Sequence, residues 1–206
     1  MPAYLAKAIA SATWAFIALF ACAAFGIALN IATVGKAADE SEGTAIARSL
    51  TAMLSAGLIV ISNNQELIDN PEIGDKGLDG KSVLEQAQKI FRETTGTDPL
   101  KIDPGSRHGR LLRVEMDAIV EVMTAHQRKL NERGIGFKGF VPSTFGRLVV
   151  EAFNRGAQGN AELKMTAPVE IVRNRKARPD RWEDFVIREK LTSATWPKGE
   201  LFAAVA

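Results

Sequence analysis

A long stretch without charge near the N-terminus limits what this chain can fold into. No acidic or basic residue lies between Lys7 and Lys36, and residues 8–34 read AIASATWAFIALFACAAFGIALNIATV. About 20 predominantly apolar residues are enough to span the hydrocarbon core of a bilayer. The stretch therefore predicts a signal-anchor transmembrane helix within residues 1–36, followed by one domain in residues 37–206.

The charges on either side of this stretch predict its orientation. Lys7 and the amino terminus precede it, whereas Lys36 is soon followed by three acidic residues. Because positively charged flanks remain in the cytoplasm, we expect a single-pass protein of the inner (cytoplasmic) membrane with its C-terminal domain in the periplasm. Two alternatives stay open, namely cleavage of the stretch as a signal peptide and lipidation at Cys22.

The composition is that of an ordinary globular domain. Hydrophobic residues make up 46% and charged residues 24%, and a net charge of +2 gives no indication of a nucleic acid partner. Cys22 is the single cysteine, which excludes an intrachain disulfide, a cysteine-based zinc site and a Cys-x-x-Cys-His haem attachment in this sequence. An activated nucleophile, a metal-binding helix motif and a phosphate loop are also missing, so we expect no metal and no enzymatic activity.

Hydrophobic periodicity predicts a series of helices. Apolar residues recur at helical spacing over Ile46–Ile68, Leu111–Glu132 and Thr144–Asn154, and capping-box spacing predicts a shorter helix over Ser82–Thr94. Ser143 is the expected N-cap of the helix that follows it.

A strand and a final helix are expected after these helices. β-branched residues alternate between Leu163 and Val172, which is typical of a strand. Asp180 and Glu183 have the spacing of a helix cap. The combination predicts an α+β domain.

Two segments carry chemistry that suits a ligand. Gly134–Gly139 fits G-x-G-x-x-G, but a helix precedes it, so we interpret it as a tight connection whose Phe137, Lys138 and Phe140 line a pocket. The basic segment 173–178 is either a solvated turn or a site for a carboxylate, propionate or lipid headgroup. His126 lies on an apolar helix face, where it is either a core histidine or a ligand of haem or metal.

Several short sequence motifs in the second half of the chain occur together in a known family. They are GFKGFVP (136–142) with Phe145 and Arg147, KMTAP (164–168), and VRNRKARPD (172–180) with Trp182. From about Ala45 to Ala206 the chain resembles the Tll-like family of extracytoplasmic domains, long catalogued as a domain of unknown function. The resemblance implies a PAS-like sensor fold with long N-terminal helices, in a family that often binds haem c and often serves as an input domain.

The resemblance and the local chemistry together predict a ligand pocket. Its predicted residues are Phe137, Lys138, Phe140, Arg147, Arg173, Asn174, Arg175, Arg178 and Trp182. His126 is the candidate haem ligand. In haem-binding members the Cys-x-x-Cys-His motif comes further along than Ala206, so we do not transfer covalent haem to this chain and expect no cofactor in it.

The expected function is that of a membrane-anchored periplasmic sensory or redox-input domain that binds a small ligand or a partner without catalysis. One alternative is a monohaem c-type cytochrome-like electron-transfer protein that lacks its haem-attachment segment. Another is a structural module that dimerises through the helix Ile46–Ile68. The expected partners are the lipid bilayer, a second copy of the chain, and a signalling or redox protein.

Overall fold

The computed structural model describes residues 39–191 and divides the chain into two compact units. One unit is Leu29–Leu163, and the other combines Met1–Ala28 with Lys164–Ala206. The predicted membrane helix and Cys22 lie outside the described residues. The units are treated separately below, and the described part of the first, residues 39–163, is called the four-helix unit.

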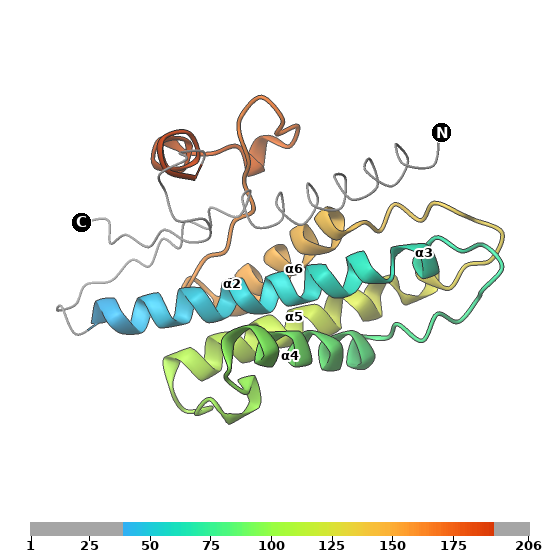
Figure 1. Ribbon diagram of the computed structural model, residues 1–206, viewed down its shortest axis with the longest axis horizontal. Helices are drawn as coiled ribbons and strands as arrows, with labels where there is room; N and C mark the ends of the chain where they lie inside the picture. The colour runs from blue at the N-terminus through green and yellow to red at the C-terminus, as the bar shows by residue number, and fades with distance from the viewer. Residues whose placement is uncertain (1–38, 192–206) are drawn as a thin grey trace, which may run out of the picture. The chain divides into compact units, whose positions relative to one another are not determined.

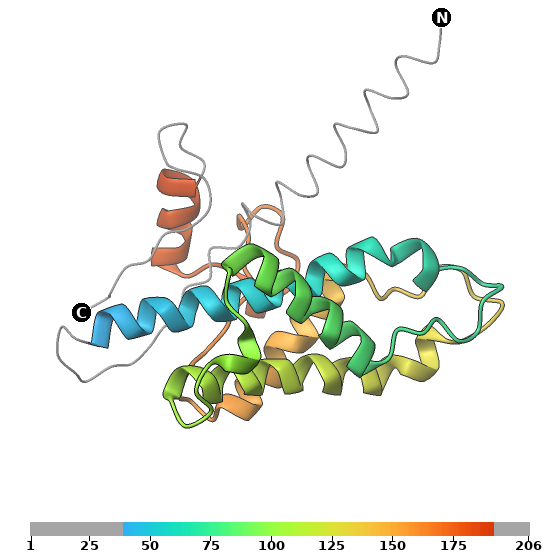
Figure 2. The same ribbon diagram turned by 60° about the horizontal axis from the view of Figure 1, so that its bottom comes forward.

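Long helices that pack side by side make up the four-helix unit (Figure 1 and Figure 2). α2 packs against α4, α5 and α6, and α5 packs against α4 and α6. Two short elements, α3 and η1, lie in the connections. The bounds are α2 Asp39–Asn63, α3 Gln65–Ile68, α4 Gly80–Thr95, η1 Pro99–Lys101, α5 Arg107–Leu130 and α6 Pro142–Ala157.

α2 supplies much of the core of this unit. Its segment Glu42–Asn63 is, among the described residues, the one helix long and apolar enough to cross a membrane by length and composition. Most of its large apolar side chains, however, are buried within the unit, and Leu50 and Ile61 are 0% exposed. Burying a side chain of this size is worth about 1.5–3 kcal/mol, so these residues hold the bundle together. A dimer seam at Leu50 and Ile61 would compete with that packing.

The helix ends follow local signals, although not always the expected ones. Gly96 ends α4 with a left-handed φ of 70°, as predicted. Its N-cap is Asp79 rather than Ser82, because the Asp79 carboxylate accepts the Ser82 N–H at 2.7 Å. The Ser143 cap is also wrong, since α6 already begins at Pro142, whose fixed φ suits the first turn of a helix.

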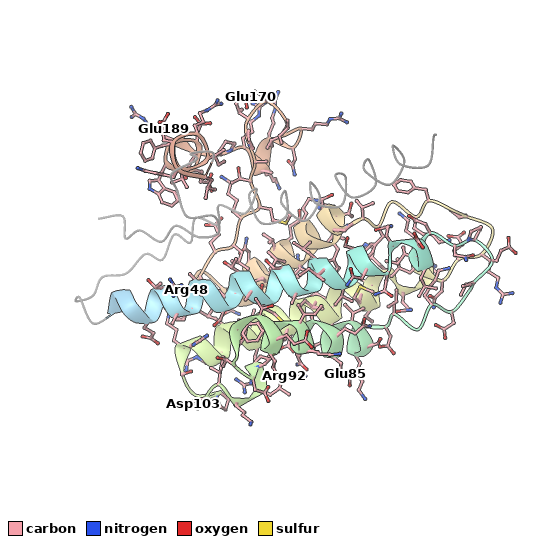
Figure 3. The ribbon with its side chains drawn as sticks, in the orientation of Figure 1. Arg48, Glu85, Arg92, Asp103, Glu170 and Glu189 are labelled. Carbon is pink, nitrogen blue, oxygen red and sulfur yellow. The ribbon has the colours of Figure 1, made fainter. Side chains whose placement is uncertain are left out.

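The outer face of α4 is charged and solvent-exposed. Figure 3 shows Glu85 and Arg92 on this helix. The Glu85 carboxylate lies 3.9 Å from the Lys81 ammonium, and the Arg92 guanidinium lies 3.8 Å from the Asp98 carboxylate. Exposed pairs of this kind add little stability, so the stability of the unit comes from its apolar interior.

The second unit contains short elements over its described residues 164–191. The predicted capping box is confirmed: the Asp180 carboxylate accepts the Glu183 N–H at 2.8 Å, and the Glu183 carboxylate accepts the Asp180 N–H at 2.6 Å. Glu183 also pairs with Lys164 at 2.6 Å, and Glu170, labelled in Figure 3, pairs with Arg188 at 2.5 Å. The elements are η2 Arg175–Ala177, α7 Arg181–Phe185 and the π-helix η3 Val186–Leu191.

The prediction of an α+β, PAS-like fold is wrong for the described chain. Residues 39–191 contain helices and connections but no strand, including the segment 163–172 where a strand was expected. A strand needs a neighbour to satisfy its backbone groups. At Leu163 a side chain fills that role, because Asn154 accepts the Leu163 N–H and donates to its carbonyl, both at 2.8 Å.

Candidate functional site

Two connections lie side by side at one end of the four-helix unit, next to α3. Residues 69–79 join α3 to α4 and residues 131–141 join α5 to α6; they are called the paired loops below. They lie side by side in both ribbon views (Figure 1 and Figure 2). The Gly134 N–H donates to the Pro71 carbonyl at 2.9 Å, and the Lys138 N–H donates to the Asp69 carboxylate at 2.8 Å. These bonds fasten each loop to the other.

Each loop is wrapped around the ammonium group of a buried lysine. Lys76 is 5% exposed and donates to the carbonyls of Asn70, at 2.6 Å, and Ile73. Lys138 is 2% exposed and donates to the carbonyls of Ile135, at 2.5 Å, and Glu132. Lysine is almost never fully buried unless its charge is paired or hydrogen-bonded. Each ammonium group therefore holds two backbone carbonyls of its own loop together, so we call the two lysines the struts of the loops.

The electrostatics of the loops reflect these two close cations. Burial, followed by repulsion from Lys138 and Arg133, lowers the pKa of Lys76, and the Asp69 carboxylate opposes that shift. Asp69 is placed for this by two bonds, one to the Lys138 N–H and one at 2.8 Å from the Gln65 side-chain amide. The Asp69 carboxylate thus partly offsets the charge of Lys76 and also accepts a backbone hydrogen bond from the other loop.

The loops present apolar side chains to solvent. Phe137 is 71% exposed, and Ile135 and Ile73 are 43% and 38% exposed. Clustered exposed apolar side chains on a rigid support are typical of binding sites. Along residues 135–140 the side chains of Ile135 and Phe137 are exposed, whereas those of Lys138 and Phe140, which follow them, are buried.

Gly139 lies next to both Lys129 and Phe137. A Cβ on Gly139 would stand 3.9 Å from the Lys129 ammonium and 4.0 Å from the edge of the Phe137 ring. Gly139 has a φ of 66°, which favours glycine. A cation and an aromatic ring therefore lie beside the same glycine.

The predicted site residues of the four-helix unit occupy different environments. Phe137 and Lys138 belong to the paired loops, but Phe140 is a core residue whose ring packs against Phe145 at 6.0 Å. Arg147 lies on α6, is exposed, and pairs with Glu151 at 2.9 Å. Of these residues, Phe137 alone offers its side chain to a ligand at the loops.

His126 is a half-buried residue of α5. Its Nδ1 lies 2.8 Å from the Val122 carbonyl of its own helix, and its ring centroid lies 5.1 Å from that of Phe140. This arrangement suits a core histidine with a satisfied hydrogen bond. Its assignment as a haem ligand stays a prediction.

The remaining predicted residues belong to the second unit. Their side chains are exposed except for Trp182, which is half-buried; they are Arg173, Asn174, Arg175, Arg178 and Trp182. Asn174 caps η2 by accepting the Lys176 N–H at 3.1 Å. The anion-site interpretation of this segment stays a prediction.

Two titratable residues of α5 were not predicted as sites, the buried Glu115 and the half-buried His108. Glu115 is 0% exposed, and neither of its carboxyl oxygens has a hydrogen-bond partner among residues 39–191. Burial raises its pKa well above the ordinary value. The buried Nε2 of His108 also lacks a partner in the described chain; burial lowers the pKa of this histidine, and Glu42 opposes that shift. The spacing of Glu115 from Leu112 and Ile119 was the sequence signal that places it on the buried face.

Comparisons with known proteins return no relative. No family model, no curated protein and no solved structure matches the chain. Within residues 39–191 there is also no cluster of three or more His, Cys, Asp or Glu side chains that would hold a metal ion.

Proposed function

We propose that this chain is a membrane-anchored extracytoplasmic input domain that binds a small amphiphilic anion at the paired loops without catalysing a reaction. The observation that carries this proposal is the exposed Phe137 on loops fixed by two buried lysines. A site that is rigid before binding loses little conformational entropy when it binds, so its contacts contribute more fully to affinity.

The chemistry beside Gly139 supports a ligand with two parts. The Phe137 ring and Ile135 offer apolar contact, while the Lys129 ammonium offers a partner for a carboxylate or a sulfonate. An aromatic carboxylate combines both parts. The ligand class is therefore an apolar ring or chain that ends in an anionic group.

The anchor is assigned to residues 8–34, which lie outside the described residues. The apolar segment Glu42–Asn63 is needed as a core helix, since Leu50, Met53 and Ile61 are each 0% exposed. A bilayer span at this position would remove α2 from the unit that it stabilises.

The test is a binding titration of the full chain in lipid nanodiscs with naphthoate, observed by line broadening of the naphthoate NMR signals against empty nanodiscs. Phe137→Ala removes the ring and is expected to weaken binding about tenfold, which corresponds to about 1.4 kcal/mol of lost contact energy. Leu100→Ala is the matched control, because Leu100 is another exposed apolar residue, at 56%, on η1.

A neutral probe separates the two parts of the site. Lys129→Gln is expected to weaken naphthoate binding but to leave binding of naphthylmethanol unchanged. If Phe137→Ala and Leu100→Ala bind naphthoate equally well, or if the wild-type protein does not bind it, the paired loops are not the ligand site.

A further inference from the structure

Glu115 is a carboxylic acid in the middle of the four-helix unit. It lies near the centre of α5, and its side chain is completely buried. The residues one helical turn away on either side are also buried; they are Leu111, Leu112, Ala118 and Ile119. The carboxyl group is therefore enclosed by the core.

The helices packed on α5 bring no charge to this carboxyl. The buried side chains that α2, α4 and α6 contribute, over the described residues, are apolar except for Gln88 of α4. The Gln88 amide donates to the Met116 sulfur at 3.4 Å. The buried cations of this unit, over the described residues, are Lys76 and Lys138. Both donate to backbone carbonyls of the paired loops.

The half-buried histidines of α5 are His126, which follows Glu115 by eleven residues, and His108. It lies seven residues before Glu115, which is two helical turns, and the charge that acts on it is that of Glu42 on α2. No charged neighbour contributes to the pKa shift of Glu115, for which burial is the single cause. Among residues 39–191, no charge and no hydrogen-bond donor compensates the ionised form of Glu115.

An ionised carboxylate in such surroundings is far more costly than a neutral acid. We propose that Glu115 is a proton-binding site, that its protonated form closes the core of the four-helix unit, and that loss of this proton loosens the bundle. This inference concerns the interior of the unit and does not depend on ligand binding at the paired loops.

The sign of the pH effect follows from proton linkage. The folded chain binds the Glu115 proton more tightly than the unfolded chain, in which the carboxyl has its ordinary pKa of about 4.3. The stabilising effect is fully present below that pH and is lost as the pH rises through the raised pKa. Over this window the unfolding equilibrium constant increases about tenfold per pH unit.

The experiment compares urea unfolding of the full chain and of Glu115→Gln in the same detergent, from about pH 4.5 to about pH 8.5. The unfolding equilibrium constant of the wild type is divided by that of Glu115→Gln at each pH. This ratio is expected to rise about tenfold per pH unit until it levels off. Glu85→Gln is the control, since the Glu85 side chain is 63% exposed, and it should keep the wild-type profile.

Two further measurements keep the proposal falsifiable if the glutamine variant folds poorly. Glu115→Leu replaces the acid with an apolar side chain of similar size. This variant should fold, and its unfolding equilibrium constant should lack the tenfold rise per pH unit that is expected from Glu115. Infrared difference spectra of the wild-type protein should contain a protonated-carboxyl band at neutral pH. Parallel wild-type and variant profiles, or absence of that band, would overturn the proposal.

Discussion

At the scale of single residues, the paired loops show how a buried lysine shapes a backbone. Backbone carbonyls that turn inward need donors, and an ammonium group offers three N–H bonds from one point. Lys138 uses two of them on the carbonyls of Glu132 and Ile135. The position of the exposed Phe137 therefore depends on the buried residue next to it.

Lys138→Met should destabilise the protein by about 2 kcal/mol, because two buried carbonyls lose their donor while the side-chain length is kept. Chemical denaturation followed by circular dichroism measures the change. Lys129→Met, at an exposed lysine of α5, should stay within about 0.5 kcal/mol of wild type. Equal stability of Lys138→Met and wild type would contradict the role of Lys138 as a strut.

Single residues were also where sequence reasoning was least reliable. Glu115 has the spacing of the buried face, three residues after Leu112 and four before Ile119, but a carboxylate is rarely buried, so its residue type favoured solvent. Lys138 was assigned to a ligand pocket, whereas its ammonium bonds the loop itself. Burial of a charged side chain depends on tertiary packing, which a local pattern does not contain.

At the scale of elements, hydrophobic periodicity predicted the long helices because each buries one face. The helices α2, α4, α5 and α6 all overlap the predicted segments, but their ends differ by up to seven residues, and the segment predicted as Ile46–Ile68 divides into α2 and α3. The strand expected at 163–172 does not form, because alternation indicates a strand without supplying a neighbour for it. Pairing is a property of the whole chain rather than of the segment.

Two substitutions distinguish the expected from the observed cap of α4. Asp79→Ala should cost about 1 kcal/mol, because it removes the acceptor of the Ser82 N–H. Ser82→Ala should change stability by less than about 0.5 kcal/mol, since its hydroxyl takes part in one exposed 3.3 Å contact with Gln86. Thermal or urea unfolding measures both. If Ser82→Ala lowers the free energy of unfolding more than Asp79→Ala does, Ser82 and not Asp79 is the N-cap of α4.

At the scale of the whole molecule, the proposed N-terminal anchor precedes a helical unit with its own core. In that unit α2 is a core helix, and its apolar residues face α4, α5 and α6. The proposed orientation places this unit outside the cytoplasm.

A thiol at an exposed position tests this orientation. Leu100→Cys in a Cys22→Ser background leaves one reactive cysteine in the chain, at a residue that is 56% exposed. We expect a membrane-impermeant maleimide to label it in intact cells whose outer layer is permeable to the reagent. Labelling that occurs only after lysis would place the four-helix unit in the cytoplasm.

The most direct test of the central claim is a map of which backbone amides respond to naphthoate, from two-dimensional ¹H–¹⁵N spectra of the full chain in nanodiscs. We expect shifts in residues 69–79 and 129–141 that saturate together, and in Phe137→Ala the same shifts should need about tenfold more naphthoate to saturate. Shifts centred on the basic segment 173–178, or no saturable shifts at all, would contradict ligand binding at the paired loops.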